Sequence, residues 1–347
     1  MNANNSAGSD PFCSSTKNTV IGLARVLSML MIIGCHLASW LNINTLAMIL
    51  NVGVYIFLII SGALYSTKHI ANAWSFIRNR WFKLCVPMYL FVFIILIYNI
   101  ITSNYEALHS IPIYLLNLQG VGFIVYGISL PQMNGLGHLW FISAIMLCYV
   151  LLIAVKEIER YFSEAPCPCI YFVLPCLLFL DFILAYTVNI QLHYFIAYFI
   201  GYWVGKKSIF LSGKRYLMIT IAMVFALGIR LFSHNAIDGT VSYNDIIVPF
   251  THIMLAVWIY MSIQYVYQNA TGFMTTLANS KLINWLESLS LYIYITHYVF
   301  LIGPFYIDNL PFPTGIQLVV FFIAALASAV LLKYLSQKTI KALTTGT

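Results

Sequence analysis

Two ionisable side chains interrupt an apolar stretch near the start of the chain, where residues 24–37 read ARVLSMLMIIGCHL. They are Arg25 and His36, eleven positions apart. Eleven residues carry a helix about 20° past three full turns and roughly 16 Å along its axis, so both side chains would lie on one face. A permanent cation and a side chain that titrates near neutral pH would then share one stripe, which suits proton transfer or ligand binding. The alternative is a snorkelling arginine and a hydrogen-bonded interior histidine.

A second concentration of charge lies in FIRNRWFKLCVP, residues 76–87, which we expect to begin in a short loop. Arg78, Arg80 and Lys83 crowd this loop. Arginine grips phosphate with paired hydrogen bonds, so the cluster could clamp a ligand that carries several phosphates. Basic residues also gather at the cytoplasmic ends of membrane spans for reasons of topology alone, which is the alternative interpretation.

The composition indicates where these clusters sit. Charged residues make up 8% of the 347 and hydrophobic residues 61%, with a mean hydropathy of +0.89, whereas a soluble protein has about 25% charged residues. The apolar runs are long and continuous, which favours membrane-spanning helices over barrel strands. We therefore predict an all-α polytopic membrane protein with about ten transmembrane helices. The predicted spans are residues 20–41, 46–66, 84–102, 138–155, 170–188, 191–205, 215–232, 246–267, 286–302 and 315–335.

The distribution of basic residues predicts the orientation. With ten spans, all 17 lysines and arginines except Arg25 and Arg230 fall on one side, which the positive-inside rule assigns to the cytoplasm together with both termini. We expect residues 1–19 to form a disordered cytoplasmic tail, residues 20–335 one transmembrane domain, and residues 336–347 a second cytoplasmic tail. The outer loop 103–137 has two apolar patches, each too short to span, that could cover a cavity.

Histidines gather at one depth of this predicted bundle. With His36, four others fall in the outer half of the membrane, and Asp181 and Arg230 lie toward the same side. Ionisable groups within a membrane are costly and normally face the bundle interior or water. The sequence therefore predicts a polar cavity that opens outward, although histidines near the ends of spans could simply reach water. The four are His138, His193, His252 and His297.

These patterns together resemble the acyltransferase-3 family of bacterial membrane acyltransferases, which includes O-acetyltransferases of surface polysaccharides. The likeness covers most of the chain, and the order and spacing of the motifs carry it. The chain departs from the family pattern at Lys83, where a third arginine is common. The matching features are the Arg-x10-His pattern of Arg25 and His36, GVYIFLIISGALYS (53–66), FIRNRWFKLCVPMY (76–89), GHLWFISAIMLCYVL (137–151) and LSLYIYITHYVF (289–300).

The resemblance implies transfer of an acyl group, by family habit acetyl, from cytoplasmic acyl-CoA to a hydroxyl of a surface polysaccharide or its lipid-linked precursor. His36 would act as general base or as a transient nucleophile, and Arg25 would steer the donor or stabilise charge on the thioester oxygen. Acetyl-CoA would be a donor substrate rather than a bound cofactor. Arg78, Arg80 and Lys83 would hold the coenzyme A phosphates, and His138, His297 and Trp140 would bind or orient the acceptor.

The expected surroundings are a lipid bilayer, namely the bacterial inner membrane, with no nucleic-acid partner and no metal site. The main alternative function is a secondary transporter or flippase of a small polar or glycolipid substrate. Transporters commonly carry paired repeats with interrupted helices, and we find no such pair in the sequence. A flippase of anionic lipid-linked sugars would need basic outer loops, and the predicted outer loops have no lysine or arginine.

Overall fold

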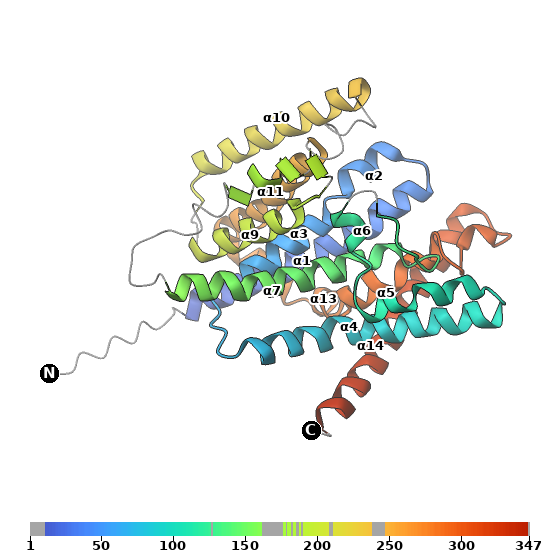
Figure 1. The fold of residues 1–347 in the computed structure, drawn as a ribbon. Helices are drawn as coiled ribbons and strands as arrows, with labels where there is room; N and C mark the ends of the chain where they lie inside the picture. The colour runs from blue at the N-terminus through green and yellow to red at the C-terminus, as the bar shows by residue number, and fades with distance from the viewer. Residues whose placement is uncertain are drawn as a thin grey trace.

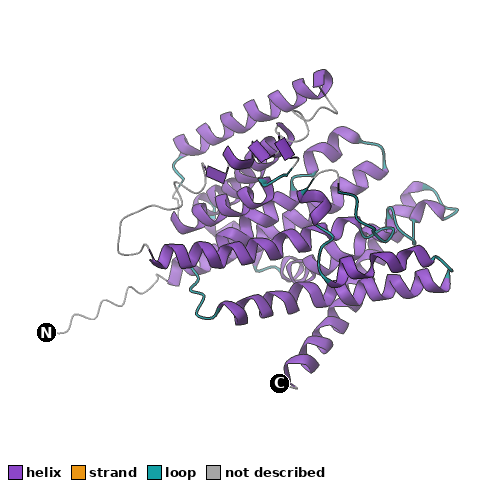
Figure 2. Cartoon of the chain, in the orientation of Figure 1, coloured by secondary structure: helices purple, strands orange, loops and turns teal. Residues whose placement is uncertain are grey.

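The computed structural model describes residues 11–125, 128–161, 190–207, 211–237 and 247–345, together with 176–177, 179–181, 183–184 and 187–188. Helices dominate these residues (Figures 1 and 2), and Val125 and Ile190 form one isolated antiparallel bridge. The predicted all-α class is thereby confirmed. The longer helices are α1 (Pro11–Trp40), α3 (Gly53–Tyr65), α4 (Ala73–Ile101), α7 (Trp140–Tyr161), α9 (His193–Lys207), α10 (Gly213–Ile237), α11 (Val248–Asn269), α13 (Lys281–Thr296) and α14 (Thr314–Thr345).

Shorter helices connect these elements. The segment between α4 and α7, which we expected to be an outer loop with two apolar patches, folds into several of them. The shorter helices of the described residues are α2 (Asn44–Leu50), α5 (Ile111–Leu115), α6 (Val121–Ile124), α12 (Thr271–Ala278) and the 3-10 helices Tyr105–Ser110, Gly137–Leu139, His297–Phe300 and Ile307–Asn309.

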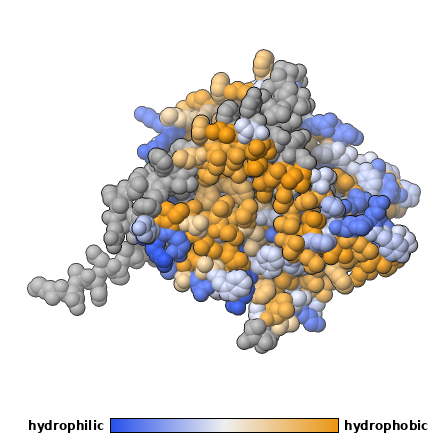
Figure 3. Space-filling view, in the orientation of Figure 1, coloured by the Kyte–Doolittle hydropathy of each residue, from blue (hydrophilic) through white to orange (hydrophobic). Residues whose placement is uncertain are grey.

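Six helical segments among the described residues are long and apolar enough to cross a membrane. The predicted spans 191–205, 246–267 and 286–302 correspond to α9, α11 and α13, while most of 170–188 lies outside the described residues. The number of ten spans and the orientation therefore stay predictions. Figure 3 shows an apolar band across one face, with hydrophilic residues mainly at its edges. The six segments are Thr19–Trp40, Asn44–Tyr65, Ala73–Ile101, Gly137–Tyr161, Gly213–His234 and Thr314–Thr344.

The helices extend further than the sequence pattern predicts. α1 begins at Pro11, inside the segment expected to be a tail, and α14 continues to Thr345. α4 begins at Ala73, well before the predicted start of its span at residue 84. The reason at α4 is a cap, because the Asn72 side chain accepts a hydrogen bond of 2.8 Å from the Ser75 backbone N–H. Residues 76–87 are therefore helical, and our expectation of a short loop at their start is wrong.

Two helix pairs organise the core. α1 lies against α13, and Arg25 contacts Glu287 while His36 contacts His297 further along both helices, so the two run in the same direction. α3 lies against α9 at very close range, because a Cβ on Gly62 would come within 1.9 Å of the Tyr198 carbonyl oxygen. Small residues at such crossings let helix backbones approach closely in a membrane. This close packing explains why a glycine stands at position 62, within the second predicted span.

Candidate active site

A basic cavity of about 440 Å³ lies between α1, α3, α4, α7 and α13. Four basic side chains line it, and among the described lining residues Glu287 is the one acidic side chain. The cavity therefore carries an excess of positive charge, which favours an anionic ligand. Its charged lining residues are Arg25, Lys68, Arg80, Lys83 and Glu287.

The surroundings of Lys68 and Arg80 reflect the positive charge of the basic cavity. Lys68 lies between α3 and α4, and burial, together with the neighbouring charges of Arg80, Lys83 and Arg25, lowers the pKa of its ammonium group. The Arg80 guanidinium carbon lies 5.3 Å from the centre of the Tyr65 ring, a cation–π distance. Its buried Nε has no hydrogen-bond partner among the described residues. Arg80 is thus positioned by an aromatic ring at the wall of the cavity.

Helix geometry separates the three basic residues predicted to bind acyl-CoA. On a helix, positions 78 and 80 lie about 160° apart, whereas positions 80 and 83 lie about 60° apart. Arg80 and Lys83 accordingly line the basic cavity, while Arg78 is exposed and is not among the residues that line it. The helical start of α4 thus gives Arg78 a different environment from its two neighbours.

An ion pair joins α1 to α13 in the wall of the basic cavity. Arg25 Nη1 lies 2.6 Å from Glu287 Oε1, and both side chains are about 30% exposed. Gly22 leaves the room for this carboxylate, because a Cβ there would lie 2.8 Å from Glu287 Oε2. The sequence reasoning missed Glu287, although an acidic residue inside a predicted span is a signal in its own right.

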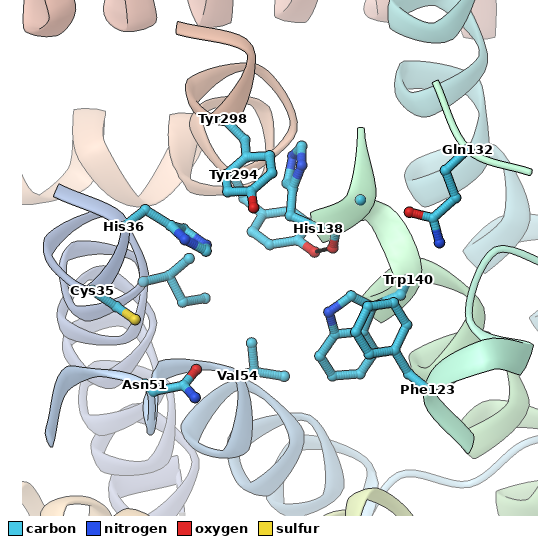
Figure 4. A pocket seen from close by; sticks show the side chains of 12 residues that line it. Cys35, His36, Asn51, Val54, Phe123, Gln132, His138, Trp140, Tyr294 and Tyr298 are labelled. Carbon is cyan, nitrogen blue, oxygen red and sulfur yellow. Dashed lines mark hydrogen bonds between the residues drawn. The ribbon is translucent and has the colours of Figure 1, made fainter. Parts of the chain in front are cut away.

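A histidine cavity of about 380 Å³ adjoins the other end of the same helix pair. Figure 4 shows His36 projecting from α1 toward the rings of Tyr294 and His138, with Trp140 and Phe123 opposite. Phe123 and Gln132 come from the segment between α4 and α7, so this segment forms part of the cavity wall as predicted. Its lining residues are Ile32, Cys35, His36, Asn51, Val54, Phe123, Gln132, Gly137, His138, Trp140, Tyr294 and Tyr298.

Three histidines meet at the histidine cavity. The ring centre of His297 lies 5.3 Å from that of His36 and 5.2 Å from that of His138. The ring centre of Tyr298 lies 4.6 Å from that of His36, 4.9 Å from that of His138 and 6.1 Å from that of His297. His297 is fully buried behind the cavity, while His36 and His138 line it. The structure therefore gathers three of the five histidines that the sequence placed at one depth.

Hydrogen bonds to the end of α13 fix two imidazole rings. His138 Nε2 lies 3.1 Å from the Ile295 carbonyl oxygen, and His297 Nδ1 lies 2.8 Å from that of Tyr294. The last carbonyl groups of a helix have no hydrogen-bond donor within the helix, and the N–H groups of these two rings act as donors to them. A carbonyl oxygen only accepts, so each contacting nitrogen carries the hydrogen. In the neutral rings, His138 Nδ1 and His297 Nε2 keep their lone pairs, and neither has a partner among the described residues.

The remaining predicted polar residues form a separate group. The ring of Tyr55 on α3 lies 5.9 Å from that of His193 and 5.0 Å from that of His252. Arg230 is 3% exposed and acts electrostatically on both Tyr55 and His252. Tyr194 joins this group to Trp140 of the histidine cavity, with ring centres 4.6 Å apart. The sequence predicted one outer cavity for all of these residues. In the structure, some of them meet at the histidine cavity, and the others form a neighbouring buried group.

The structure places some of the predicted site residues as the sequence suggested and others differently. Arg25 and His36 share a helix, and the structure places them at two adjoining cavities rather than in one. His138 and Trp140 line the histidine cavity as expected, and His297 lies behind it. Lys68 was not predicted, because a lysine in a short inner loop carries no pattern that separates it from topology. Tyr294 lies in the segment 289–300 that resembles the family, as the tyrosine of a Ser-x-x-x-Tyr-x-x-His pattern, but the sequence assigned it no role.

Comparison with known proteins adds one independent finding. Residues 18–335 match the family model of the acyltransferase domain of the acyltransferase-3 type. No match was found among curated proteins or among solved structures. The match spans nearly the whole described bundle, including both cavities and the helices that build them. The chain therefore belongs to the acyltransferase-3 family and is a membrane acyltransferase.

Proposed function

We propose that the protein moves an acyl group, most simply acetyl, from cytoplasmic acyl-CoA to a hydroxyl of a surface glycan or its lipid-linked precursor. One observation carries the proposal: a cationic cavity and a histidine-rich cavity adjoin on the α1–α13 pair. Arg25 belongs to the first and His36 to the second. This arrangement suits a reaction whose two substrates arrive from opposite sides.

The donor fits the basic cavity by charge. Coenzyme A carries several phosphates, and guanidinium groups bind phosphate through paired hydrogen bonds. Arg80 brings a guanidinium group to the wall of the cavity, and Lys68 and Lys83 add positive charge. Arg25, which lines the same cavity and lies on the same helix as His36, would act on the thioester end of the donor.

The acceptor fits the histidine cavity by its polarity and its rings. A sugar hydroxyl needs a hydrogen-bond acceptor for its proton, and His36 and His138 both line this cavity. Phe123 stacks on Trp140, with ring centres 5.0 Å apart and planes 21° apart. Flat aromatic surfaces with a few polar groups are typical of sites for small organic ligands.

The chemistry is one substitution at the thioester carbon. The acceptor oxygen forms a bond to the carbonyl carbon, the carbon–sulfur bond breaks, and coenzyme A leaves as the thiolate. His36 takes the proton of the hydroxyl and then gives it to the thiolate. In the alternative course, a His36 nitrogen attacks first and carries the acyl group before the hydroxyl receives it.

The test is to follow both products. Purified protein in vesicles receives acetyl-CoA labelled in the acetyl group, together with a glycan or lipid-linked glycan fraction. Release of free coenzyme A thiol in equal amount to labelled ester in the glycan fraction is the expected result. Thiol release without ester would indicate hydrolysis. Neither product, with the protein folded and present, would contradict the proposal and direct attention to transport.

A further inference from the structure

Tyr294 lines both cavities. It lies on α13, seven residues after Glu287 of the basic cavity and three before His297. Seven residues bring a helix to within about 20° of the same face, which explains how one helix serves both sites. The residue is 3% exposed and lines both cavities, so its side chain lies in the wall that they share.

The Tyr294 ring is held on several sides. Its hydroxyl donates a hydrogen bond to the His138 backbone carbonyl. Its ring centre lies 5.6 Å from that of Phe141, which lines the basic cavity, and 5.2 Å from that of His138, which lines the histidine cavity. Phe141 in turn packs against Phe57, with ring centres 5.9 Å apart. Aromatic rings thus stand between the cationic side chains and the histidines.

We infer that Tyr294, with Phe141 behind it, forms a partition that limits the length of the acyl group transferred. The inference rests on the proposed function, in which the thioester end of the donor must come from the basic cavity to His36. A short acyl group needs only a narrow opening beside the ring. A longer chain must displace a ring that is held by close aromatic contacts, and packed interiors resist such displacement.

The ring, rather than the hydroxyl, sets this limit. Tyr294→Phe removes the hydrogen bond to the His138 carbonyl but keeps the six-membered ring in the wall. Tyr294→Ala removes the wall itself and joins the two cavities. Phe141→Ala opens the partition from the donor side without touching α13. Tyr298 lines only the histidine cavity, so Tyr298→Ala is a matched control for the loss of an aromatic ring nearby.

The experiment compares acetyl-, butyryl- and hexanoyl-CoA as donors for wild type and for each variant in vesicles. The measured quantity is the ratio of hexanoyl to acetyl transfer at equal donor concentration. We expect Tyr294→Ala and Phe141→Ala to raise this ratio by about tenfold or more, the scale on which a pocket discriminates small changes in chain length. Tyr294→Phe and Tyr298→Ala should leave the ratio within about twofold of wild type, whatever their rates.

An enlarged residue gives a second test that does not depend on a truncated variant folding. Tyr294→Trp should stop acetyl transfer while acetyl-CoA still binds at the basic cavity, measured by displacement of a labelled donor. Unchanged ratios in the folded truncations, or wild-type transfer by Tyr294→Trp, would overturn the inference while leaving the proposed function intact. Failure of wild type to transfer from any acyl-CoA would overturn both.

Discussion

Arg25 and Glu287 form an ion pair of 2.6 Å that joins α1 to α13 in the wall of the basic cavity. Both side chains remain about 30% exposed, so the pair contributes little to stability in itself. Its position suggests a functional role instead. The carboxylate holds the guanidinium in place at the wall of the basic cavity, and it also places one negative charge where the proposed anionic donor would bind.

The ion pair predicts a coupled effect of its two members on donor binding. Arg25→Ala should raise the donor KM by about tenfold, because it removes a cation and leaves the Glu287 carboxylate to repel phosphate. Arg25→Ala combined with Glu287→Gln should recover part of that loss, since the repelling charge is gone. The check is a double-mutant cycle on the donor KM. Strictly additive single effects would show that the two residues act on the donor independently and not as a pair.

Arg80 and Arg78 offer a matched pair of substitutions on one helix. Arg80→Ala should raise the donor KM, because Arg80 lines the basic cavity, whereas Arg78→Ala should leave it within about twofold, because Arg78 is exposed on another face. Both changes remove one positive charge from the same end of α4, so any effect on membrane topology is shared. Equal effects on the donor KM would mean that the cluster acts through topology alone.

The hydrogen bonds at the end of α13 predict opposite tautomers for two neighbouring histidines. His297 should carry its hydrogen on Nδ1 and His138 on Nε2, because the contacting carbonyl oxygens only accept. Nitrogen NMR of protein labelled at histidine distinguishes the two forms, and His297→Ala and His138→Ala assign the signals. The same tautomer at both positions would contradict the arrangement described above.

The α3–α9 crossing predicts a steric penalty at Gly62. A methyl group there would meet the Tyr198 carbonyl oxygen at 1.9 Å, so Gly62→Ala should destabilise the protein by about 1–3 kcal/mol and lower its melting temperature in detergent. Gly228→Ala on α10 is the control, because a Cβ there meets nothing within 4 Å. Equal melting temperatures for the two variants would show that the crossing is looser than described.

The helical class and the family were accessible from the sequence because they depend on composition and on local spacing. Apolar runs predict membrane helices, and the eleven-residue spacing placed Arg25 and His36 on one face of α1. What the sequence did not reveal depends on contacts between helices. Glu287 is 262 residues from Arg25, and His138 meets the end of α13 across more than 150 residues.

The start of α4 shows how a local error changed the predicted site. Reading the start of residues 76–87 as a loop grouped Arg78 with Arg80 and Lys83, since a loop can turn all three toward one ligand. The Asn72 cap makes the segment helical and sets Arg78 apart. Asparagine followed by an apolar helix is a recognised start signal, so this boundary was available in the sequence. By contrast, the sharing of Tyr294 between two cavities requires the packed bundle.

His36 carries the central claim that acyl transfer takes place at the histidine cavity. The most direct measurement incubates membranes containing wild type or His36→Ala with acetyl-CoA labelled in the acetyl group and counts label in the glycan and lipid-linked fractions, at equal protein abundance. We expect label with wild type and a loss of about 10²–10⁴-fold with His36→Ala, the range for removal of a general acid–base. Wild-type labelling by His36→Ala would contradict the proposed mechanism.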